Sequence, residues 1–395
     1  LFVIPPSSAD DEEGNGPGSA EREAAERVIQ LIVDVIHDCL AQSTPALPPH
    51  WNVSITSLIH KKDNRSLLTN SRPISVCTLI YRILSRCLAD ALQTALPWLI
   101  DSAQVACQEG KSCFANSRYV QDLIHYADSV QVPGLLVFLD ATKAFDRCQH
   151  PFLLRTMEKM SLPPAFITMF TMLLTGATTR VKVNGYLGTP IALHNGVRQG
   201  CPIAALAYLL YLQPFLSLLS SCTRVHRTIP LADGSTQLVK LAGVPIPSRD
   251  GDGYTTHLAV AMADDVFAGL RDTSQLHPFR LLLAVHERAS GGLNNWQKTL
   301  LLRVGSLRGS TTLPSDWDPS HGIFDADLIR YLGIFTGLPA AVLAQWLPPN
   351  SPNPPHKPPD DLTSRMERRL ALWTASPTYA GRNLTLKNSI LSMAW

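Results

Sequence analysis

The hydrophobic positions of the chain fall into stretches with different spacings. From Glu21 to about Leu40 they recur every three or four residues, which predicts an amphipathic helix that packs through one face. The run Leu135–Leu139 is short and continuously apolar, as in a buried strand, whereas Ala204–Leu219 is long enough for a buried helix. The same reasoning predicts a strand over 51–60, helices over 77–96, 151–160 and 163–175, and a hairpin over 180–186 that turns at Asn184-Gly185.

The stretches between these elements lack periodicity. Residues 1–20 are acidic and contain Gly, Pro and Ser, so we expect them to be disordered. Residues 220–257 are expected to be irregular, with turns at Asp233-Gly234 and at 250–253. The second turn has some features of a calcium loop, but it lacks the downstream glutamate, which favours an ordinary surface turn. Residues 338–360 are rich in proline and are expected to form a linker.

Composition narrows the class of protein only slightly. Charged residues make up 17% of the 395 positions and the net charge is +2, which does not identify a nucleic-acid binder. Residues 51–126 carry eight Lys/Arg and five Asp/Glu, which suits either phosphate contact or an ordinary solvated surface. The eight cysteines contain no CxxC pair, so we expect no structural zinc site, and we expect no membrane span. Because the chain begins with Leu1 and not with Met, we expect it to be part of a longer protein.

Two adjacent carboxylates, Asp264-Asp265, are the most informative feature for function. The chain has two other Asp-Asp pairs, Asp10-Asp11 and Asp360-Asp361, and both lie in polar or proline-rich surroundings. Only Asp264-Asp265 is flanked on both sides by strand-forming residues, which predicts a tight β-turn at the edge of a sheet. The pair is either an ordinary polar turn or a set of ligands for a hard divalent cation.

A third carboxylate favours the metal interpretation. Asp140 directly follows the predicted buried strand Leu135–Leu139. Two strands that carry aspartates at neighbouring ends can lie side by side in one sheet. Asp140 and Asp264 would then meet at one pair of cations, which is the arrangement that serves in-line phosphoryl displacement.

Eight further patterns follow one another along the chain: Leu58–Asp63, Ser71–Ser75, Phe138–Asp146, Asn195–Pro202, Met262–Asp265, Ser290–Thr299, Tyr331–Ile334, and Trp373 with Gly381–Leu384 and Lys387. In these patterns the chain resembles the reverse transcriptases, most closely those of non-LTR (LINE-type) retrotransposons, from about residue 48 to its end. It departs from the family at Met262, where an aromatic residue is usual, at Ala204-Ala205 after Pro202, and at Lys111, where arginine is common.

The resemblance implies an α+β fold of the right-hand polymerase type, with fingers, a palm that contains an antiparallel sheet, and a partial thumb. The expected segments are a disordered acidic start with an N-terminal helix (1–45), fingers (46–130), a palm (131–337) with an interleaved fingers segment at about 151–200, a Pro-rich linker (338–360) and the start of a thumb (361–395).

The resemblance also assigns the catalytic residues. Asp140 and Asp264 would bridge two Mg²⁺ ions, which Mn²⁺ can replace, and Asp265 would be the third and least essential carboxylate. Lys298 would protonate the leaving pyrophosphate, although a solvated lysine fits its position nearly as well. Asp146 is expected to anchor its motif and not to bind metal.

A second group of residues is expected to contact the nucleotide and the nucleic acid. Phe145 stands five residues after Asp140, where the family places a ring that excludes a 2′-hydroxyl; its alternative is an aromatic of the core. The other expected nucleotide-binding residues are Lys62, Arg72, Gln199 and Gly200, and the expected nucleic-acid contacts are Lys111, Arg198 and Arg382.

These residues predict an RNA-directed DNA polymerase of a retroelement, which transfers nucleotides from dNTPs to a primer 3′-hydroxyl. The expected partners are an RNA template, a DNA primer and dNTPs, and the family implies the nucleus as the location. Two alternatives are a catalytically dead or domesticated scaffold that binds RNA or protein, and an RNA-dependent RNA polymerase. The intact aspartates favour catalysis over the scaffold, and Phe145 argues against the RNA polymerase.

Overall fold

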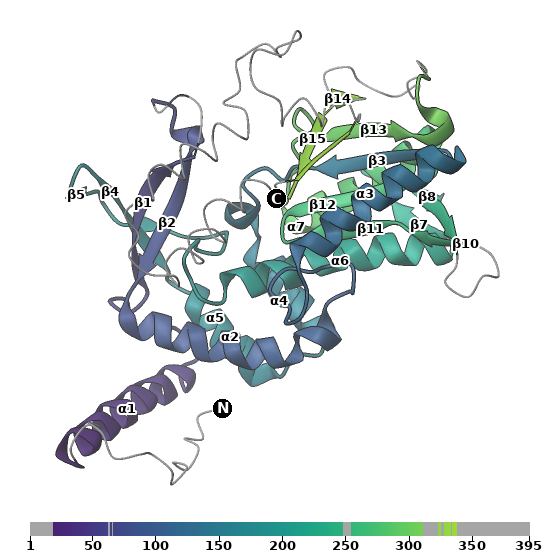
Figure 1. Ribbon diagram of the computed structural model, residues 1–395. Coiled ribbons are helices and arrows are strands. Elements are labelled where there is room, and N and C mark those ends of the chain that lie inside the picture. The colour runs from purple at the N-terminus through teal and green to yellow at the C-terminus, as the bar shows by residue number, and fades with distance from the viewer. Residues whose placement is uncertain are drawn as a thin grey trace.

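Helices, two five-stranded sheets and three two-stranded sheets make up the described part of the chain (Figure 1). The computed structural model describes residues 19–61, 64, 66–247, 254–310, 323–324, 328–332 and 334–337. In these residues the helices are α1 (Ser19–Leu40), α2 (Leu79–Leu99), α3 (Cys113–Val130), α4 (His150–Lys159), α5 (Pro164–Leu174), α6 (Ala204–Arg224) and α7 (Leu276–Ser290).

The first sheet is built from two distant parts of the sequence. Its central strand β1 pairs antiparallel with β2 and parallel with β4, and the chain returns from β4 through the predicted turn at Asn184-Gly185. Both turn residues have positive φ, as the Asn-Gly signal predicts. The strands are β1 (Val53–His60), β2 (Ser71–Cys77), β4 (Thr178–Val183), β5 (Tyr186–Leu187) and β6 (Ile191–Ala192).

Buried hydroxyl groups hold the three long strands of the first sheet together. Thr56 Oγ1 lies 2.8 Å from Ser75 Oγ and 2.7 Å from Thr179 Oγ1. Thr179 also donates to the backbone carbonyl of Ser54. Because these hydroxyls find partners, polar side chains occupy the buried face without leaving unpaired groups away from water. The cluster therefore favours one register of β1 against β2 and β4.

The second sheet has the strand order β11-β12-β3-β13-β14. Strand β3 lies at its centre, antiparallel to both β12 and β13, and all six of its residues are buried. The prediction of a buried strand at 135–139 is therefore confirmed. The strands are β3 (Gly134–Leu139), β11 (Ala259–Met262), β12 (Asp265–Leu270), β13 (Leu300–Val304) and β14 (Ile323–Phe324).

Apolar side chains cover the second sheet on both faces. On one face, Leu136 and Phe138 of β3 belong to a cluster with α3 residues such as Leu123. On the other face, Leu135 and Val137 belong to the main core, to which α6 and α7 also contribute. In Figure 1, α3 lies in front of this sheet, and α6 and α7 lie behind it. Because successive side chains of β3 pack into two different cores, its sequence is apolar at nearly every position.

The predictions for the remaining helices are largely confirmed. Strand β1 and helices α2, α4, α5 and α6 lie where the apolar spacing places them, and α6 continues five residues beyond Leu219 to Arg224. Helix α1 also forms, but it packs mainly through its second half: Ile36 and Cys39 are buried, whereas Val28 and Leu31 are 58% and 64% exposed. Helices α3 and α7 were not predicted.

The prediction that residues 220–257 are irregular is wrong. After α6 ends, this segment forms two short antiparallel hairpins, and the first turns at the predicted Asp233-Gly234. Each strand has four residues. The first pair is β7 (Arg227–Pro230) with β8 (Thr236–Val239), and the second is β9 (Val244–Pro247) with β10 (Tyr254–His257). A further hairpin joins β15 (Leu328–Tyr331) to β16 (Ile334–Gly337).

One helix in the described residues is long and apolar enough to cross a membrane by length and composition alone. This helix is α6, and 67% of its most apolar window is buried inside the protein. Its apolar surface is therefore used in the core that it shares with α7 and the second sheet.

Some predictions fall on residues that lie outside the described ranges and are not addressed by the structure. They concern the start of the chain (1–18), Lys62, the turn at 250–253, the linker (338–360), and the thumb segment (361–395) with Arg382.

Candidate active site

The Asp-Asp pair lies at a tight turn between two strands, as predicted. Met262 of β11 pairs with Asp265 of β12, so the turn consists of Ala263 and Asp264. Ala263 has a φ of 53°, and Asp264 does not have a positive φ, as in a type II′ turn. An alanine in this left-handed region costs about 1–2 kcal/mol, so neighbouring contacts must hold the turn in place.

Asp140 lies at the same end of the sheet. Val266 of β12 is the register partner of Leu139, so Asp140 follows the end of β3 at the point where β12 begins with Asp265. The pKa of Asp265 is raised to about 6, first by burial and then by the negative charges of Asp264 and Asp140. The structure thus brings the three predicted carboxylates close enough to influence one another, although Asp264 and Asp265 lie 124 and 125 positions after Asp140 in the sequence.

The segment that carries Lys298 is held against the backbone after Asp140. The Asn295 N–H donates to the Asp140 carbonyl at 2.7 Å, and the Thr142 N–H donates to the Leu293 carbonyl at 2.8 Å. A turn closed by the Lys298 N–H and the Asn295 carbonyl (3.0 Å) then leads into β13, and the Lys298 side chain is exposed. Lys298 is therefore near the carboxylate end of the sheet and is accessible to a ligand.

Phe145 rests on a buried tyrosine beside the carboxylates. Its ring stacks on Tyr208 of α6 with centroids 4.9 Å apart and an angle of 24° between the planes. Burial raises the pKa of Tyr208 well above its ordinary value, and the negative charge of Asp264 raises it further. Phe145 is half-buried, so part of its surface packs in the core and part remains exposed. The two interpretations of Phe145, sugar contact and core aromatic, are thus compatible.

The loop with Gln199 and Gly200 is fixed between the two sheets. The Ser75 N–H of β2 donates to the Gln199 carbonyl at 2.7 Å, and Gln199 Nε2 donates weakly to Asp146 Oδ1 at 3.4 Å. Gly200 has a φ of 113°, and a Cβ there would overlap the Ser75 carbonyl oxygen. The Val197 N–H donates to the Phe145 carbonyl at 2.9 Å. These contacts bring the second predicted motif directly beside the first.

Asp146 contacts the loop of the second motif through Gln199. Burial raises its pKa, while the hydrogen bond from Gln199 and the positive charge of Lys143 lower it. Its contact with Gln199 joins the segment after Asp140 to the loop of the second motif.

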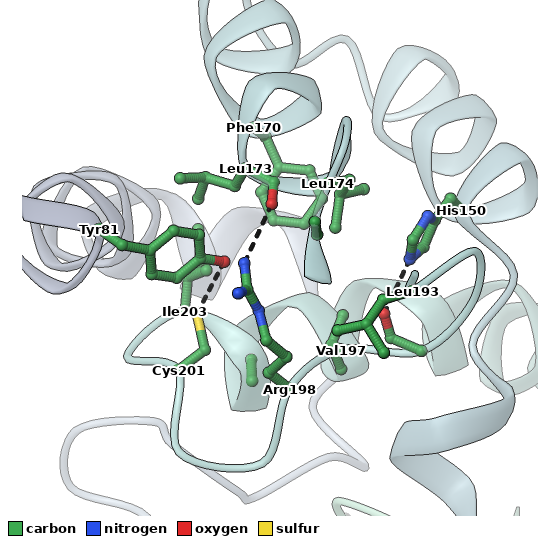
Figure 2. Close-up of a pocket in the computed structure, with 13 residues that line it drawn as sticks. Tyr81, His150, Phe170, Leu173, Leu174, Leu193, Val197, Arg198, Cys201 and Ile203 are labelled. Carbon is green, nitrogen blue, oxygen red and sulfur yellow. Dashed lines mark hydrogen bonds between the residues drawn. The ribbon is translucent and has the colours of Figure 1, made fainter. Parts of the chain in front are cut away.

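Arg198, which was predicted to contact nucleic acid, has its guanidinium bound by groups of the protein itself. Its guanidinium lies 4.1 Å from the centre of the Tyr81 ring, donates to Asn52 Oδ1 at 2.6 Å, and donates to the Leu173 carbonyl at 3.3 Å. Figure 2 shows the side chain pointing inward, between Tyr81 and α5, and Cys201 beside the Tyr81 hydroxyl. Arg198 therefore positions its loop against α2 and α5. A sequence pattern does not distinguish this arginine from a surface one.

The remaining basic residues lie at the rim of the site. Arg72 is exposed on β2, beside Ile59 of β1, as a ligand contact requires. Lys61, which was not predicted, is exposed, and its positive charge lowers the pKa of Asp265. The Lys111 amine donates to the carbonyls of Ser102 and Gln104 at 3.3 and 3.2 Å, so it supports a loop.

The donor set suits a cation that is bound together with a substrate. In the described residues, no three acidic, histidine or cysteine side chains lie close enough to hold a metal ion by themselves. Mg²⁺ is usually bound through one or two carboxylates and the phosphates of a substrate, and not by a complete protein cage. The mutual repulsion that raises the pKa of Asp265 is relieved by a bound cation. The three aspartates therefore fit Mg²⁺ that arrives with a triphosphate.

A sheet that presents carboxylates at one end, with a stacked aromatic and a loop beside them, is an arrangement suited to phosphoryl transfer. Comparison with known proteins identifies it further: residues 59–334 match the family described as reverse transcriptase (RNA-dependent DNA polymerase). This match covers most of the chain, and the chain belongs to the reverse transcriptase family.

Its relatives are retrotransposon proteins. The chain is 29% identical over 289 residues to an uncharacterized 149 kDa protein of transposon TX1 from Xenopus laevis, covering 73% of the chain and 20% of that protein. It is 27% identical over 309 residues to a retrovirus-related Pol polyprotein of the type-1 retrotransposable element R2 from Popillia japonica, covering 76% and 41%. The chain thus spans about a fifth to two fifths of the length of these relatives.

Among solved structures, the chain is similar to telomerase from Candida tropicalis in complex with a fragment of telomeric RNA. The sequence identity is 12%, the TM-score is 0.48, and the match covers 93% of this chain and 56% of that one.

Proposed function

We propose that this chain is the RNA-directed DNA polymerase domain of a non-LTR retrotransposon protein. The observation that carries the proposal is the meeting of Asp140, Asp264 and Asp265 at one end of the second sheet in a chain of the reverse transcriptase family. The reaction is attack of a primer 3′-hydroxyl on the α-phosphorus of a dNTP, directed by an RNA template, with release of pyrophosphate.

The side chains of the site divide this work between them. Asp140 and Asp264 would hold two Mg²⁺ ions, with Asp265 as the more peripheral carboxylate. When bound, these ions lower the pKa of the primer hydroxyl and neutralise charge on the leaving pyrophosphate. Lys298 donates a proton to that pyrophosphate, and Arg72 and Lys61 contact the triphosphate from the rim. Phe145 forms the floor beneath the sugar.

The two sheets support the expected division of the chain into subdomains. Strands β4 to β6 lie in the first sheet with β1 and β2, although β3 and two helices separate them in the sequence. This arrangement supports fingers built from 46–130 together with an interleaved segment at about 151–200. The second sheet, with α3, α6 and α7, is then the palm that carries the aspartates.

The proposal is tested by replacing the two inner carboxylates. Purified wild-type protein, Asp140→Asn and Asp264→Asn are supplied with poly(rA)/oligo(dT), Mg²⁺ and dTTP. We expect each variant to lose more than about 100-fold in activity, because even residues that only support a metal ligand contribute about 10- to 100-fold. Asp90→Asn is the matched control, since Asp90 is an exposed residue of α2 whose ion pair with Arg86 is worth about 1 kcal/mol or less.

Two results would contradict the proposal. Wild-type protein that binds the template-primer but adds no nucleotide, also when the flanking parts of the natural protein are included, would indicate a scaffold. Preference for ribonucleotides over deoxynucleotides would indicate an RNA polymerase. Asp265→Asn is expected to lose less activity than the other two variants, because Asp265 is the outermost of the three carboxylates.

A further inference from the structure

The turn that presents Asp264 is held by a side chain from a distant loop. Gln104 is fully buried, and its Oε1 accepts a hydrogen bond from the Ala263 N–H at 2.9 Å. Its Nε2 donates to the Ala263 carbonyl at 3.4 Å, a longer contact. One amide group thus holds both backbone groups of the residue that precedes Asp264, across 159 positions of sequence.

The backbone around Gln104 explains why this side chain reaches the turn. Strand β11 is the edge of the second sheet, and residues 103–105 pair with it at Ala261. The Ala261 N–H donates to the Ala103 carbonyl at 2.8 Å, and the Val105 N–H donates to the Ala261 carbonyl at 2.9 Å. A carboxamide has the same C=O and N–H groups as a peptide bond. Gln104 therefore continues this pairing for one further step, from the strand to the turn.

Further contacts hold Gln104 and its partner strand in place. The Ala106 N–H donates to Gln104 Oε1 at 3.1 Å, which fixes the side-chain oxygen, and the Lys111 amine binds the Gln104 carbonyl. Buried Asn116 of α3 donates to the Ala261 carbonyl at 3.1 Å. The Gln104 amide is therefore set in position before any ligand binds.

The strain at Ala263 gives this contact a function. A residue with φ of 53° is stable only when its surroundings enforce that conformation, because most side chains avoid it. Without Gln104, the Ala263–Asp264 peptide can rotate to a less strained turn, and the Asp264 carboxylate then moves relative to Asp140. Displacements of about 1 Å can lower a reaction rate about 100-fold.

We propose that Gln104 is a positioning residue of the polymerase site, which maintains the strained Ala263 turn and thereby aims Asp264. The inference rests on the proposed function, since it explains how the chain presents one of the metal-binding carboxylates. It assigns the 103–106 loop to the active site through its contact with the Ala263 turn.

The test uses Gln104→Met, which keeps the length of the side chain and removes its hydrogen bonds. Gln213→Met is the matched control: Gln213 is also a buried glutamine, and it accepts from the Asp101 N–H at 2.9 Å and donates to Ser217 at 2.9 Å without touching the turn. Hydrogen exchange of peptides within 259–270 is measured in the free protein, together with kcat, the KM for dTTP and thermal stability.

We expect Gln104→Met to lose exchange protection at Ala263 and to lower kcat by about tenfold or more, with KM changed by less than about twofold. Gln213→Met should change thermal stability by a similar amount and leave kcat and the Ala263 amide unaffected. Adding Ala263→Gly to Gln104→Met should restore at least part of kcat, because glycine adopts a positive φ without strain.

Equal effects of Gln104→Met and Gln213→Met on kcat, or full protection of Ala263 in Gln104→Met, would overturn the inference. If Gln104→Met does not fold, Gln104→Glu replaces it. A glutamate keeps one oxygen that accepts from the Ala263 N–H, so the Ala263 amide should stay protected, and loss of that protection also overturns the inference. An inactive wild-type protein would count against the proposed function alone, because hydrogen exchange reports on the turn without catalysis.

Discussion

Phe145 is half-buried and stacks on a ring of the core, and this contact gives it a rigid position. The stacked Tyr208 ring below it is 3% exposed, so Phe145 cannot sink when a larger sugar arrives. A fixed ring beneath the sugar excludes a 2′-hydroxyl by steric overlap.

Phe145→Ala should therefore relax the choice of sugar. We expect the ratio of kcat/KM for dTTP to that for UTP to fall by about tenfold or more, since a single well-placed steric contact gives discrimination of this order. Phe152→Ala is the control, because Phe152 packs on Tyr211 and His286 without reaching the carboxylates. A decrease that is the same for both nucleotides would show that Phe145 serves only as a core aromatic.

Single residues also show where prediction from sequence ends. The carboxylates could be found because a charged pair between two apolar strands is unusual in any sequence. Gln104 and Arg198 could not be found, because their partners are set by the tertiary fold and nothing in the adjacent sequence marks them. Lys61 was missed because nothing in the adjacent sequence marks its electrostatic contact with Asp265.

At the scale of elements, the loop over 195–200 joins the two sheets. It is bonded to β2 through Gln199 and to the segment after β3 through Val197. The close approach of Gly200 to Ser75 leaves no room for a side chain. The two sheets are therefore held in one relative position at the point where the nucleotide is expected to bind.

Gly200→Ala should weaken this junction. A Cβ at position 200 would overlap the Ser75 carbonyl oxygen, and the backbone conformation there favours glycine. We therefore expect the free energy of unfolding to fall by about 1–3 kcal/mol, as measured by urea denaturation. Gly234→Ala is the matched control, because Gly234 also has a positive φ (85°) but has nothing within 4 Å of its added Cβ. A similar cost for both variants would mean that φ alone, and not the contact with β2, requires glycine at 200.

The elements themselves were predictable where one physical signal dominated. Continuous apolar runs predicted β3 and α6, and Asn184-Gly185 predicted its hairpin. The hairpins between 227 and 257 were missed because their strands have only four residues and contain Pro230, Pro245 and Pro247, which normally argue against a strand. Such strands form because the surrounding structure supports them.

At the scale of the whole molecule, the main core contains one histidine whose charge is suppressed. His286 of α7 is 8% exposed and is surrounded by the rings of Phe152, Tyr211 and Phe215. Burial lowers its pKa from 6.5 to about 4. Between these two pH values the unfolded chain binds a proton that the folded chain does not bind, so stability falls as the pH falls through this window.

His286→Phe should remove this dependence. Relative to the variant, the wild-type protein should lose about 3 kcal/mol of unfolding free energy between pH 7 and pH 4, from a shift of about 2.5 pKa units. Urea denaturation of both proteins across this range provides the measurement. Because every other titrating group is shared, parallel curves would show that His286 is not kept neutral in the folded protein.

The covering of the second sheet by α3 on one face, and by α6 and α7 on the other, restricts how a primer can reach the carboxylates. Both broad surfaces of this sheet are packed against helices, so under the proposed function a primer terminus would approach at the rim where β3 ends and β12 begins. Each added nucleotide would then require the product to withdraw from that stationary rim.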